Sequence, residues 1–272
     1  MRVIRNVADL RPALDPARRA GEKIGLVPTM GALHAGHLSL IAAAREANAQ
    51  VVVSLFVNPA QFGRGEDLER YPRDEAGDIV AAEAAGVDIL FMPPAAQVYP
   101  EGYDTWIDPG AIGTHLEGSA RTGHFRGVAT ICTKLFLLVE PQRAYFGRKD
   151  AQQVAVVKQV VRDFELPVEI VVCPIMRDAD GLALSSRNRL LSSGERASAL
   201  ALPRALEAGL AAYRSGTDAV RAARAVLDAQ PGLRVDYVAE ADLDGPTLAA
   251  AVLVGSTRLI DNVLLDTEAQ PA

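Results

Sequence analysis

Short hydrophobic runs alternate with amphipathic stretches through the first two thirds of the chain. Five runs are rich in Val, Ile and Leu, as expected for strands buried on both faces of a parallel sheet: residues 24–27, 51–57, 87–92, 143–146 and 168–173. Apolar residues recur at helical spacing in five others: 7–20 (with Pro12 expected to interrupt it), 38–48, 74–85, 124–139 and 150–164. This alternation is typical of βαβ units with right-handed crossovers. It predicts an α/β, Rossmann-like parallel sheet with helices on both faces.

The alternation stops near residue 175. Two alanine-rich helical stretches follow, at 195–213 and 218–229, and then three strand-like runs at 234–239, 251–254 and 258–265. We therefore expect two domains, a Rossmann-like domain at 1–175 and a small α+β C-terminal lid domain at 176–272. Within the first domain, the segment 95–122 has no clear period and is predicted to be irregular.

Composition narrows the class of protein. The 272 residues are 49% hydrophobic and 23% charged, which is typical of a soluble globular chain. A formal net charge of −6 argues against a nucleic-acid partner. No run has the length of a membrane span, the first residues lack an apolar signal segment, and the two cysteines, Cys132 and Cys173, lie in apolar runs without metal or redox spacing. We expect a cytoplasmic protein with reduced thiols and no membrane or nucleic-acid partner.

The densest polar chemistry lies between the first predicted strand and its helix. Residues 28–37 read PTMGALHAGH. A strand, a tight turn and a helix start direct backbone N–H groups and the helix dipole toward an anion. His34 and His37 are suited to hold phosphate oxygens as negative charge develops on them. The alternative is a capping turn whose histidines satisfy local backbone groups.

Polar side chains also follow the other strands, and ligands of open α/β sheets bind beyond the carboxyl ends of the strands. Gln61 follows the second strand, Lys149 and Gln153 follow the fourth, and Ser185-Ser186-Arg187 follow the fifth. Each has a plainer interpretation: the glutamines as surface residues, Lys149-Asp150 as a solvated helix start capped by Asp150, and the serines as a turn. Gathered at one edge, they predict an ATP site. No GxxxxGK[ST], GxGxxG, HExxH or GxSxG motif occurs, which disfavours the corresponding kinases, dehydrogenases, zinc peptidases and serine hydrolases.

Six motifs, in this order, resemble those of the pantothenate synthetase (pantoate–β-alanine ligase) family: PTMGALHAGH (28–37), FVNPAQF (56–62), YPR (71–73), GHFRGV (123–128), GRKDAQQ (147–153) and DGLALSSRN (180–188). The His-Ala-Gly-His element is also similar to that of the wider HIGH-type nucleotidyltransferases. The resemblance implies an ATP-dependent ligase that condenses (R)-pantoate with β-alanine through a pantoyl adenylate, releasing AMP and pyrophosphate. It further implies Mg²⁺ and a homodimer.

The resemblance also assigns residues to roles. His37 matches the proton donor, and His34 and Lys149 would assist it. Gln61 would hold pantoate and β-alanine, and Gln153 pantoate. The ATP site would comprise Met30, Gly31, Ala32, Leu33, His34, Ala35, Gly36, His37, Gly147, Arg148, Lys149, Asp150, Met176, Leu184, Ser185, Ser186 and Arg187.

The chain departs from the family pattern at a few positions. Leu184, Arg148 and Thr122 replace the more usual Met, Glu and Pro. Gly77-Asp78 stands where some members have paired acids near the magnesium, so Asp78 is a candidate ligand, and the alternative is magnesium held chiefly by the phosphates. For the dimer interface we expect the segment 95–122 and the helix after it, because Trp106, Ile107 and Leu116 have no evident periodic place in the pattern.

Two rival functions remain. One is an adenylyltransferase of the same superfamily that acts on a phosphate acceptor, which would call for basic residues in place of Gln61 and Gln153. The other is a catalytically silent nucleotide-binding module, which would have no need to keep His34, His37 and Lys149 together.

Overall fold

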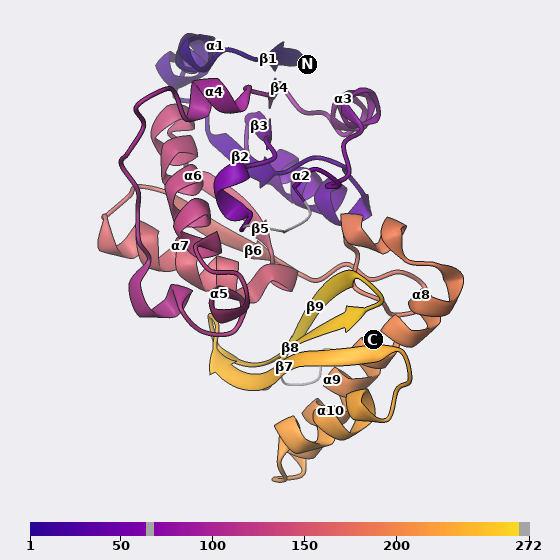
Figure 1. The fold of residues 1–272 in the computed structure, drawn as a ribbon. Helices are drawn as coiled ribbons and strands as arrows, with labels where there is room; N and C mark the ends of the chain where they lie inside the picture. Colours follow the sequence, from indigo (N-terminus) through magenta and orange to yellow (C-terminus); the bar gives the residue numbers. More distant parts are fainter. Residues whose placement is uncertain (64–67, 267–272) are drawn as a thin grey trace. The chain divides into compact units, whose positions relative to one another are not determined.

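A computed structural model describes residues 1–63 and 68–266 (Figure 1). The chain forms two compact units, one of residues 1–148 and 153–174, the other of residues 149–152 and 175–272. Each unit has its own hydrophobic core.

The first unit is built on a six-stranded sheet in which every pair of neighbours is parallel. Its strands are β1 (Arg2–Ile4), β2 (Ile24–Thr29), β3 (Gln50–Leu55), β4 (Ile89–Phe91), β5 (Arg143–Gly147) and β6 (Glu169–Cys173), in the order β1-β4-β3-β2-β5-β6. The sequence did not predict β1, which has three residues and only Ile4 buried. The predicted Rossmann-like architecture is confirmed.

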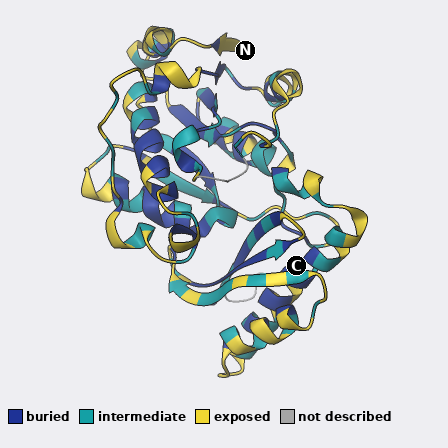
Figure 2. Ribbon diagram, in the orientation of Figure 1, coloured by how far each residue is buried: buried dark blue, intermediate teal, exposed yellow. Residues whose placement is uncertain are grey.

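Helices cover both faces of this sheet because its strands are apolar on both sides. The longer ones are α1 (Val7–Arg19), α2 (Ala35–Ala47), α3 (Glu75–Ala84), α6 (His124–Val139) and α7 (Ala151–Asp163), and the short ones are α4 (Ala95–Val98) and α5 (Glu117–Ala120). On β2, Leu26 belongs to the core under α1, α6 and α7, whereas its neighbour Val27 belongs to the core under α2 and α3. Strands β2, β3, β4 and β5 accordingly lie in the buried interior of the unit, whereas β1 and β6 at the sheet edges are more exposed (Figure 2).

The expected break of the first helix at Pro12 is wrong, since α1 runs through both Pro12 and Pro16. Each proline removes one backbone donor. Leu10 and Leu14 of the same helix are fully buried, so the packing of its apolar face outweighs the missing hydrogen bonds.

The segment 95–122 contains only short helices, as predicted, yet its apolar residues are placed within the unit. Trp106 stacks on Tyr99 with ring centroids 5.5 Å apart, and Ile107 packs against the core. Both residues are therefore packed within the first unit, although the sequence pattern gives them no periodic place.

The second unit has an antiparallel three-stranded sheet of β7 (Leu233–Asp242), β8 (Pro246–Val254) and β9 (Thr257–Leu264). Its helices are α8 (Ser193–Ala199), α9 (Ala201–Arg214) and α10 (Ala219–Asp228). One helix was predicted where α8 and α9 lie, and the chain breaks between them because Pro203 has no N–H to donate to the carbonyl of Ala199.

The strand order places the candidate chemistry of the first unit at a topological switch point. β2 pairs with β3 on one side and with β5 on the other, and the order of the strands reverses there. The segments that follow these three strands leave the sheet at the same edge, which is where ligands of open α/β sheets bind. They contain the turn Met30 to His37, Gln61 and Arg148.

Candidate active site

The turn after β2 encloses a carboxylate. Gly31 and Ala32 have φ of +84° and +50°, and consecutive left-handed residues direct their neighbouring N–H groups into one concavity. There the N–H of Ala32 donates to Asp78 Oδ2 at 2.8 Å, and that of Leu33 donates to Asp78 Oδ1 at 2.6 Å. Asp78 lies on α3 and is only 3% exposed. The turn thus binds an anion as predicted, but for these two N–H groups the anion is the protein's own carboxylate.

Gly31 is required at this turn for two reasons. Its φ is one that side chains disfavour, and a Cβ there would lie 2.9 Å from both Asp78 Oδ2 and Leu55 Cδ2. The close fit of Asp78 to the turn therefore depends on a glycine at position 31.

His34 caps the helix that follows. It has an extended backbone, and its Nδ1 accepts a hydrogen bond of 3.2 Å from the N–H of Gly36. An accepting Nδ1 carries no proton, so the ring is the neutral tautomer with its hydrogen on Nε2. The His37 ring lies beside it, with centroids 4.1 Å apart. The capping alternative is therefore confirmed for Nδ1 of His34, and the Nε2 hydrogen is the one that His34 could donate to a phosphate oxygen.

Gln61 is held at both its side chain and its main chain. It ends a short 3-10 helix, Pro59–Gln61, and is 7% exposed, so its interpretation as a surface residue is wrong. Its Oε1 accepts from Asn58 Nδ2 at 3.0 Å. Its carbonyl oxygen lies 3.2 Å from Arg121 Nη2 and 2.9 Å from His124 Nδ1. Sequence reasoning did not single out these three partners, although Asn58 and His124 lie inside two of the six motifs.

Helix α6 packs directly against this 3-10 helix. A Cβ at Gly127 would lie 2.3 Å from the carbonyl oxygen of Ala60, so only glycine permits this approach. The approach also brings the Gly127 carbonyl within 3.1 Å of Asn58 Nδ2. By contrast, Gln153, the second predicted pantoate residue, is partly exposed at the start of α7.

The end of β5 lies beside the turn because β5 and β2 are paired. Gly147 ends the strand, and Arg148 begins a 3-10 helix that ends at Asp150. Arg148, expected to add positive charge near the phosphates, is 8% exposed.

The second unit carries the remaining predicted ATP residues. Lys149 Nζ lies 3.6 Å from Asp150 Oδ1, and the Lys149 carbonyl accepts from Asn262 Nδ2 at 2.9 Å. The N–H of Leu184 donates to the carbonyl of Met176 at 2.9 Å, which brings these two predicted residues together.

Ser185, Ser186 and Arg187 follow directly. Ser185 Oγ accepts from the N–H of Arg187 at 3.3 Å and so caps the 3-10 helix Ser186–Leu190, and Ser186 is 7% exposed. The turn alternative is thus confirmed as local structure.

Two ion-pair groups hold the loop that precedes Leu184. Arg196 Nη2 lies 2.6 Å from Asp178 Oδ2 and 2.8 Å from Asp180 Oδ2. Arg177 donates from both Nη atoms to the buried carboxylate of Asp261, at 2.6 and 3.1 Å, the bidentate geometry that arginine favours.

Asp78 is the side chain that the family resemblance suggests as a magnesium ligand. Among residues 1–63 and 68–266, no group of three or more His, Cys, Asp or Glu could hold a metal ion. Both oxygens of Asp78 already accept backbone hydrogen bonds, so a contact with magnesium would have to share them.

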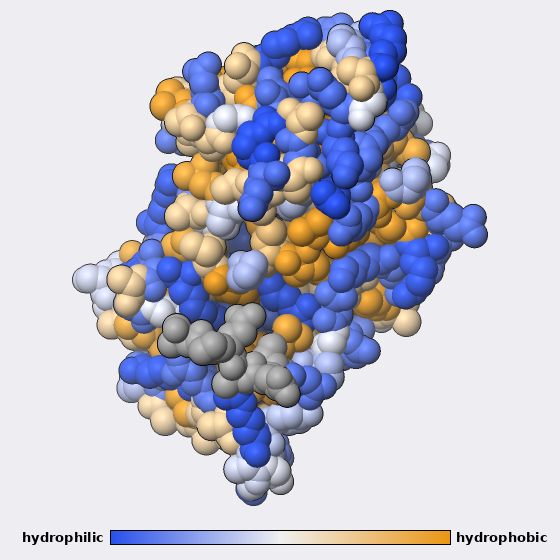
Figure 3. Space-filling model, turned by 180° about the vertical axis from the view of Figure 1, so that it is seen from behind, coloured by the Kyte–Doolittle hydropathy of each residue, from blue (hydrophilic) through white to orange (hydrophobic). Residues whose placement is uncertain are grey.

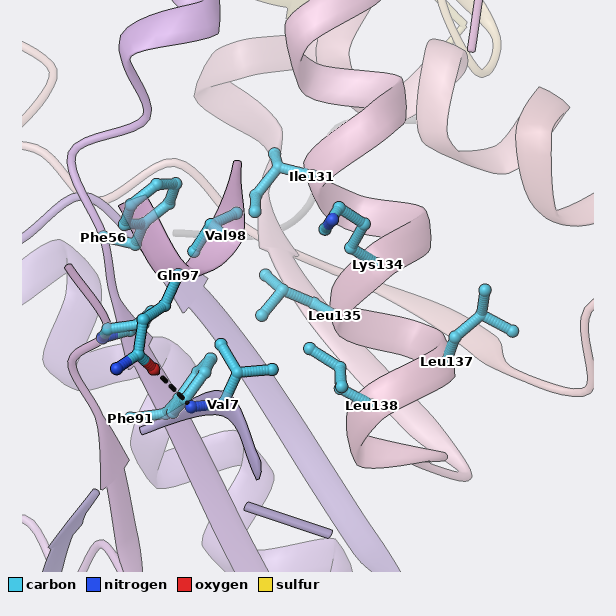
Figure 4. Close-up of a pocket in the computed structure, with 11 residues that line it drawn as sticks. Val7, Phe56, Phe91, Gln97, Val98, Ile131, Lys134, Leu135, Leu137 and Leu138 are labelled. Atoms are coloured by element: carbon cyan, nitrogen blue, oxygen red, sulfur yellow. Dashed lines mark hydrogen bonds between the residues drawn. The ribbon is translucent and has the colours of Figure 1, made fainter. Parts of the chain in front are cut away.

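A cavity of about 230 Å³ in the first unit is distinct from this chemistry (Figure 4). Its walls come from α4, α6, the N-terminus of α1 and the ends of β3 and β4. They are mainly apolar: Val7, Phe56, Phe91, Pro93, Val98, Ile131, Leu135, Leu137 and Leu138, with Gln97 and Lys134 as the polar members. Among the described residues, its lining includes none of the predicted site residues.

Comparisons with known proteins agree with the resemblance found in the sequence. The family model described as pantoate-beta-alanine ligase matches residues 2–264. The pantothenate synthetase of Roseiflexus castenholzii is 51% identical, with 98% of this chain and all of that protein covered. That of Acetivibrio thermocellus is 49% identical at the same coverage.

Solved structures of this kind are also similar. The pantothenate synthetase of Thermus thermophilus superposes with a TM-score of 0.91 at 46% identity, covering 97% of this chain and 99% of that one. The pantoate-beta-alanine ligase of Francisella tularensis, crystallised with "Beta-gamma ATP and Beta-alanine", gives a TM-score of 0.86 at 36% identity and covers 98% and 99%. In the described part of the chain, no helix has the length and apolarity needed to cross a membrane.

We predict that Asp78→Asn lowers the free energy of unfolding by about 2–3 kcal/mol, the contribution of a hydrogen bond to a charged group. The amide would lose one acceptor and present a donor to a backbone N–H. Asp74→Asn is the matched control, because Asp74 caps the same helix by accepting from Gly77 N at 3.0 Å and asparagine caps equally well. Urea denaturation of both variants measures the difference, and equal stability of the two would contradict the prediction.

Proposed function

The chain belongs to the pantoate-beta-alanine ligase family, and we propose that it condenses (R)-pantoate with β-alanine at the expense of ATP. One observation supports this most: the His34–His37 turn and the buried amide of Gln61 follow adjacent strands at a topological switch point. ATP and β-alanine, named with the Francisella structure, are two of the three substrates.

The proposed reaction has two steps. A pantoate carboxylate oxygen attacks the α-phosphorus of ATP, and pyrophosphate leaves. The amine of β-alanine then attacks the carbonyl carbon of the pantoyl adenylate, AMP leaves, and the nitrogen loses a proton. The adenylate supplies a better leaving group than oxide, so the protein contributes mainly positioning and charge stabilisation.

The chain's own residues divide this work. His37 is the proton donor, His34 donates from Nε2, and Lys149 offsets negative charge on the phosphates. Gln61 and Gln153 hold pantoate, and Gln61 also meets β-alanine. ATP contacts extend over residues 30–37, 147–150, 176 and 184–187, and the second unit acts as a lid. Bound Mg²⁺ would neutralise phosphate charge. Among the protein side chains, Asp78 is the candidate ligand of this ion.

The rival functions fit less well. A phosphate acceptor would need basic side chains at Gln61, whose buried amide is instead bonded to Asn58. If the chain were a silent nucleotide-binding module, it would release no pyrophosphate when ATP and pantoate are supplied together. A pyrophosphate-release assay therefore separates such a module from the proposed ligase.

We also propose a cytoplasmic homodimer. Both cysteines are buried and free, and burial raises the pKa of Cys132 to about 12, which makes its thiol inert.

For the dimer interface we favour α6. Leu137 is 55% exposed on this helix, and Leu135 and Leu138 of the same helix line the apolar cavity beside it. The face of the molecule shown in Figure 3 mixes hydrophobic and hydrophilic residues.

His37→Ala should lower the rate of adenylation about 100- to 1,000-fold, the usual effect of removing one donor that stabilises developing charge. The fold should persist, because the residue is only partly buried. His115→Ala, which alters an exposed histidine, is the control and should change the rate less than about twofold. Near-normal turnover of His37→Ala would show that His37 is not the proton donor.

The stepwise route predicts exchange of labelled pyrophosphate into ATP with pantoate present and β-alanine absent. Lys149→Ala should suppress this exchange, because its charge offsets that of the departing pyrophosphate. Lys23→Ala, at an exposed lysine, should not. Exchange that required β-alanine would instead indicate a concerted reaction.

Sedimentation at micromolar concentration should show a species of twice the 28.9 kDa chain mass. Leu137→Asp should shift it toward the monomer, because a charge would be buried in the interface. Phe164→Asp, at another exposed apolar residue, serves as the control. A single 28.9 kDa species in the unmodified protein would rule out the dimer.

A further inference from the structure

The amide of Gln61 stands at the end of a chain of hydrogen bonds that begins at Tyr99. The Tyr99 hydroxyl donates to Asn58 Oδ1 at 2.9 Å, and Asn58 Nδ2 donates to Gln61 Oε1 at 3.0 Å. All three residues belong to the first unit.

The bonds of Asn58 leave only one orientation for its amide. Besides Tyr99, its Oδ1 accepts from the N–H of Ala60 at 3.2 Å, and besides Gln61, its Nδ2 donates to the carbonyl of Gly127 at 3.1 Å. An amide has two hydrogens and two lone pairs, so all four positions are used. Turning it over would place its NH₂ against a backbone N–H and its oxygen against a backbone carbonyl. Asn58 is 1% exposed, so bulk water cannot compensate for those mismatches.

This orientation determines which end of Gln61 is directed away from Asn58. Since Oε1 accepts from Asn58, the hydrogen-bonding atom left at the other end is Nε2, which can only donate. Gln61 Nε2 can therefore bind an acceptor, and pantoate offers carboxylate and hydroxyl oxygens.

An aromatic cluster fixes Tyr99 in turn. Trp106 stacks on it at 5.5 Å, Tyr103 lies edge-on at 5.1 Å, and Lys134 Nζ lies 5.6 Å from the Tyr99 ring and 4.3 Å from that of Tyr103. Arg126 lies over Trp106 at 5.0 Å. Burial raises the pKa of the Tyr99 hydroxyl, so it remains a donor at any working pH.

We propose that Tyr99 is a positioning residue for pantoate, which acts through Asn58 to hold Gln61 with Nε2 facing the substrate. The inference rests on the proposed function, because it assigns pantoate to Gln61. This role of Tyr99 would involve the irregular segment 95–122 in the binding of pantoate.

Tyr99→Phe tests this by removing only the hydroxyl. The loss of one neutral hydrogen bond should raise KM for pantoate about five- to tenfold and leave KM for ATP unchanged. Tyr103→Phe is the matched control, since Tyr103 contributes its ring to the same cluster, and it should leave both KM values unchanged. An equal effect on the two KM values, or none in Tyr99→Phe, would overturn the proposal.

A double-mutant cycle separates positioning through Gln61 from a general loosening of the fold. In a Gln61→Ala background, Tyr99→Phe should change KM for pantoate less than about twofold, whereas a full effect of about five- to tenfold would refute the route through Gln61. Gln61→Glu adds a test of the donor role, since it keeps an acceptor for Asn58 but has no N–H. It should raise KM for pantoate at least as much as Gln61→Ala, and a smaller rise would contradict that role. Failure of the unmodified protein to form pantothenate and AMP from ATP, pantoate and β-alanine would instead defeat the proposed function.

Discussion

The hydrogen bonds between the Asp78 carboxylate and the N–H groups of Ala32 and Leu33 are the interaction on which the site depends. A buried carboxylate is costly unless it is paired, and two short charge-assisted bonds satisfy it. They join α3 to the turn between β2 and α2, which are otherwise separate in the sequence. They also stabilise two successive left-handed residues, a conformation that is unfavourable for Ala32 by itself. The position at which α2 begins, and hence that of His34 and His37, follows from this contact.

The second half of the site in the first unit is built in a similar way. Gln61 lies on a 3-10 helix of three residues, too short to be rigid alone. Its rigidity comes from α6, which approaches through Gly127, and from Asn58, whose amide is fully bonded. In both halves a neighbouring helix supplies the polar or backbone group that fixes a short loop at the sheet edge. This is how a loop can position a side chain as accurately as a helix does.

The sequence predicts the bounds of a helix or strand well where glycine or proline marks its ends. Helix α6 begins after Gly123 and ends before Pro141, and its predicted bounds match the structure. The break between α8 and α9 depends on one proline within an alanine-rich stretch that otherwise favours helix. The contact of Asp78 with Ala32 and Leu33, 46 and 45 positions away, leaves no periodic signal in the sequence. The family resemblance names Asp78 only as a candidate metal ligand and gives no indication of these backbone contacts. Tyr99 was missed for the same reason: its partner Asn58 lies 41 positions earlier, and its own segment has no period.

His34 shows why local structure and catalysis need not be alternatives. As the cap of α2, His34 accepts the Gly36 N–H at Nδ1, which requires a neutral ring. The positive end of the helix dipole likewise disfavours a positive charge on the ring. The proton is thereby confined to Nε2, the atom that the cap does not use. A capping serine or aspartate would satisfy the same N–H but would leave no oriented N–H donor beside His37. The helix start thus selects the tautomer that the proposed chemistry needs, so the plain structural role of His34 is part of what suits it to a phosphate.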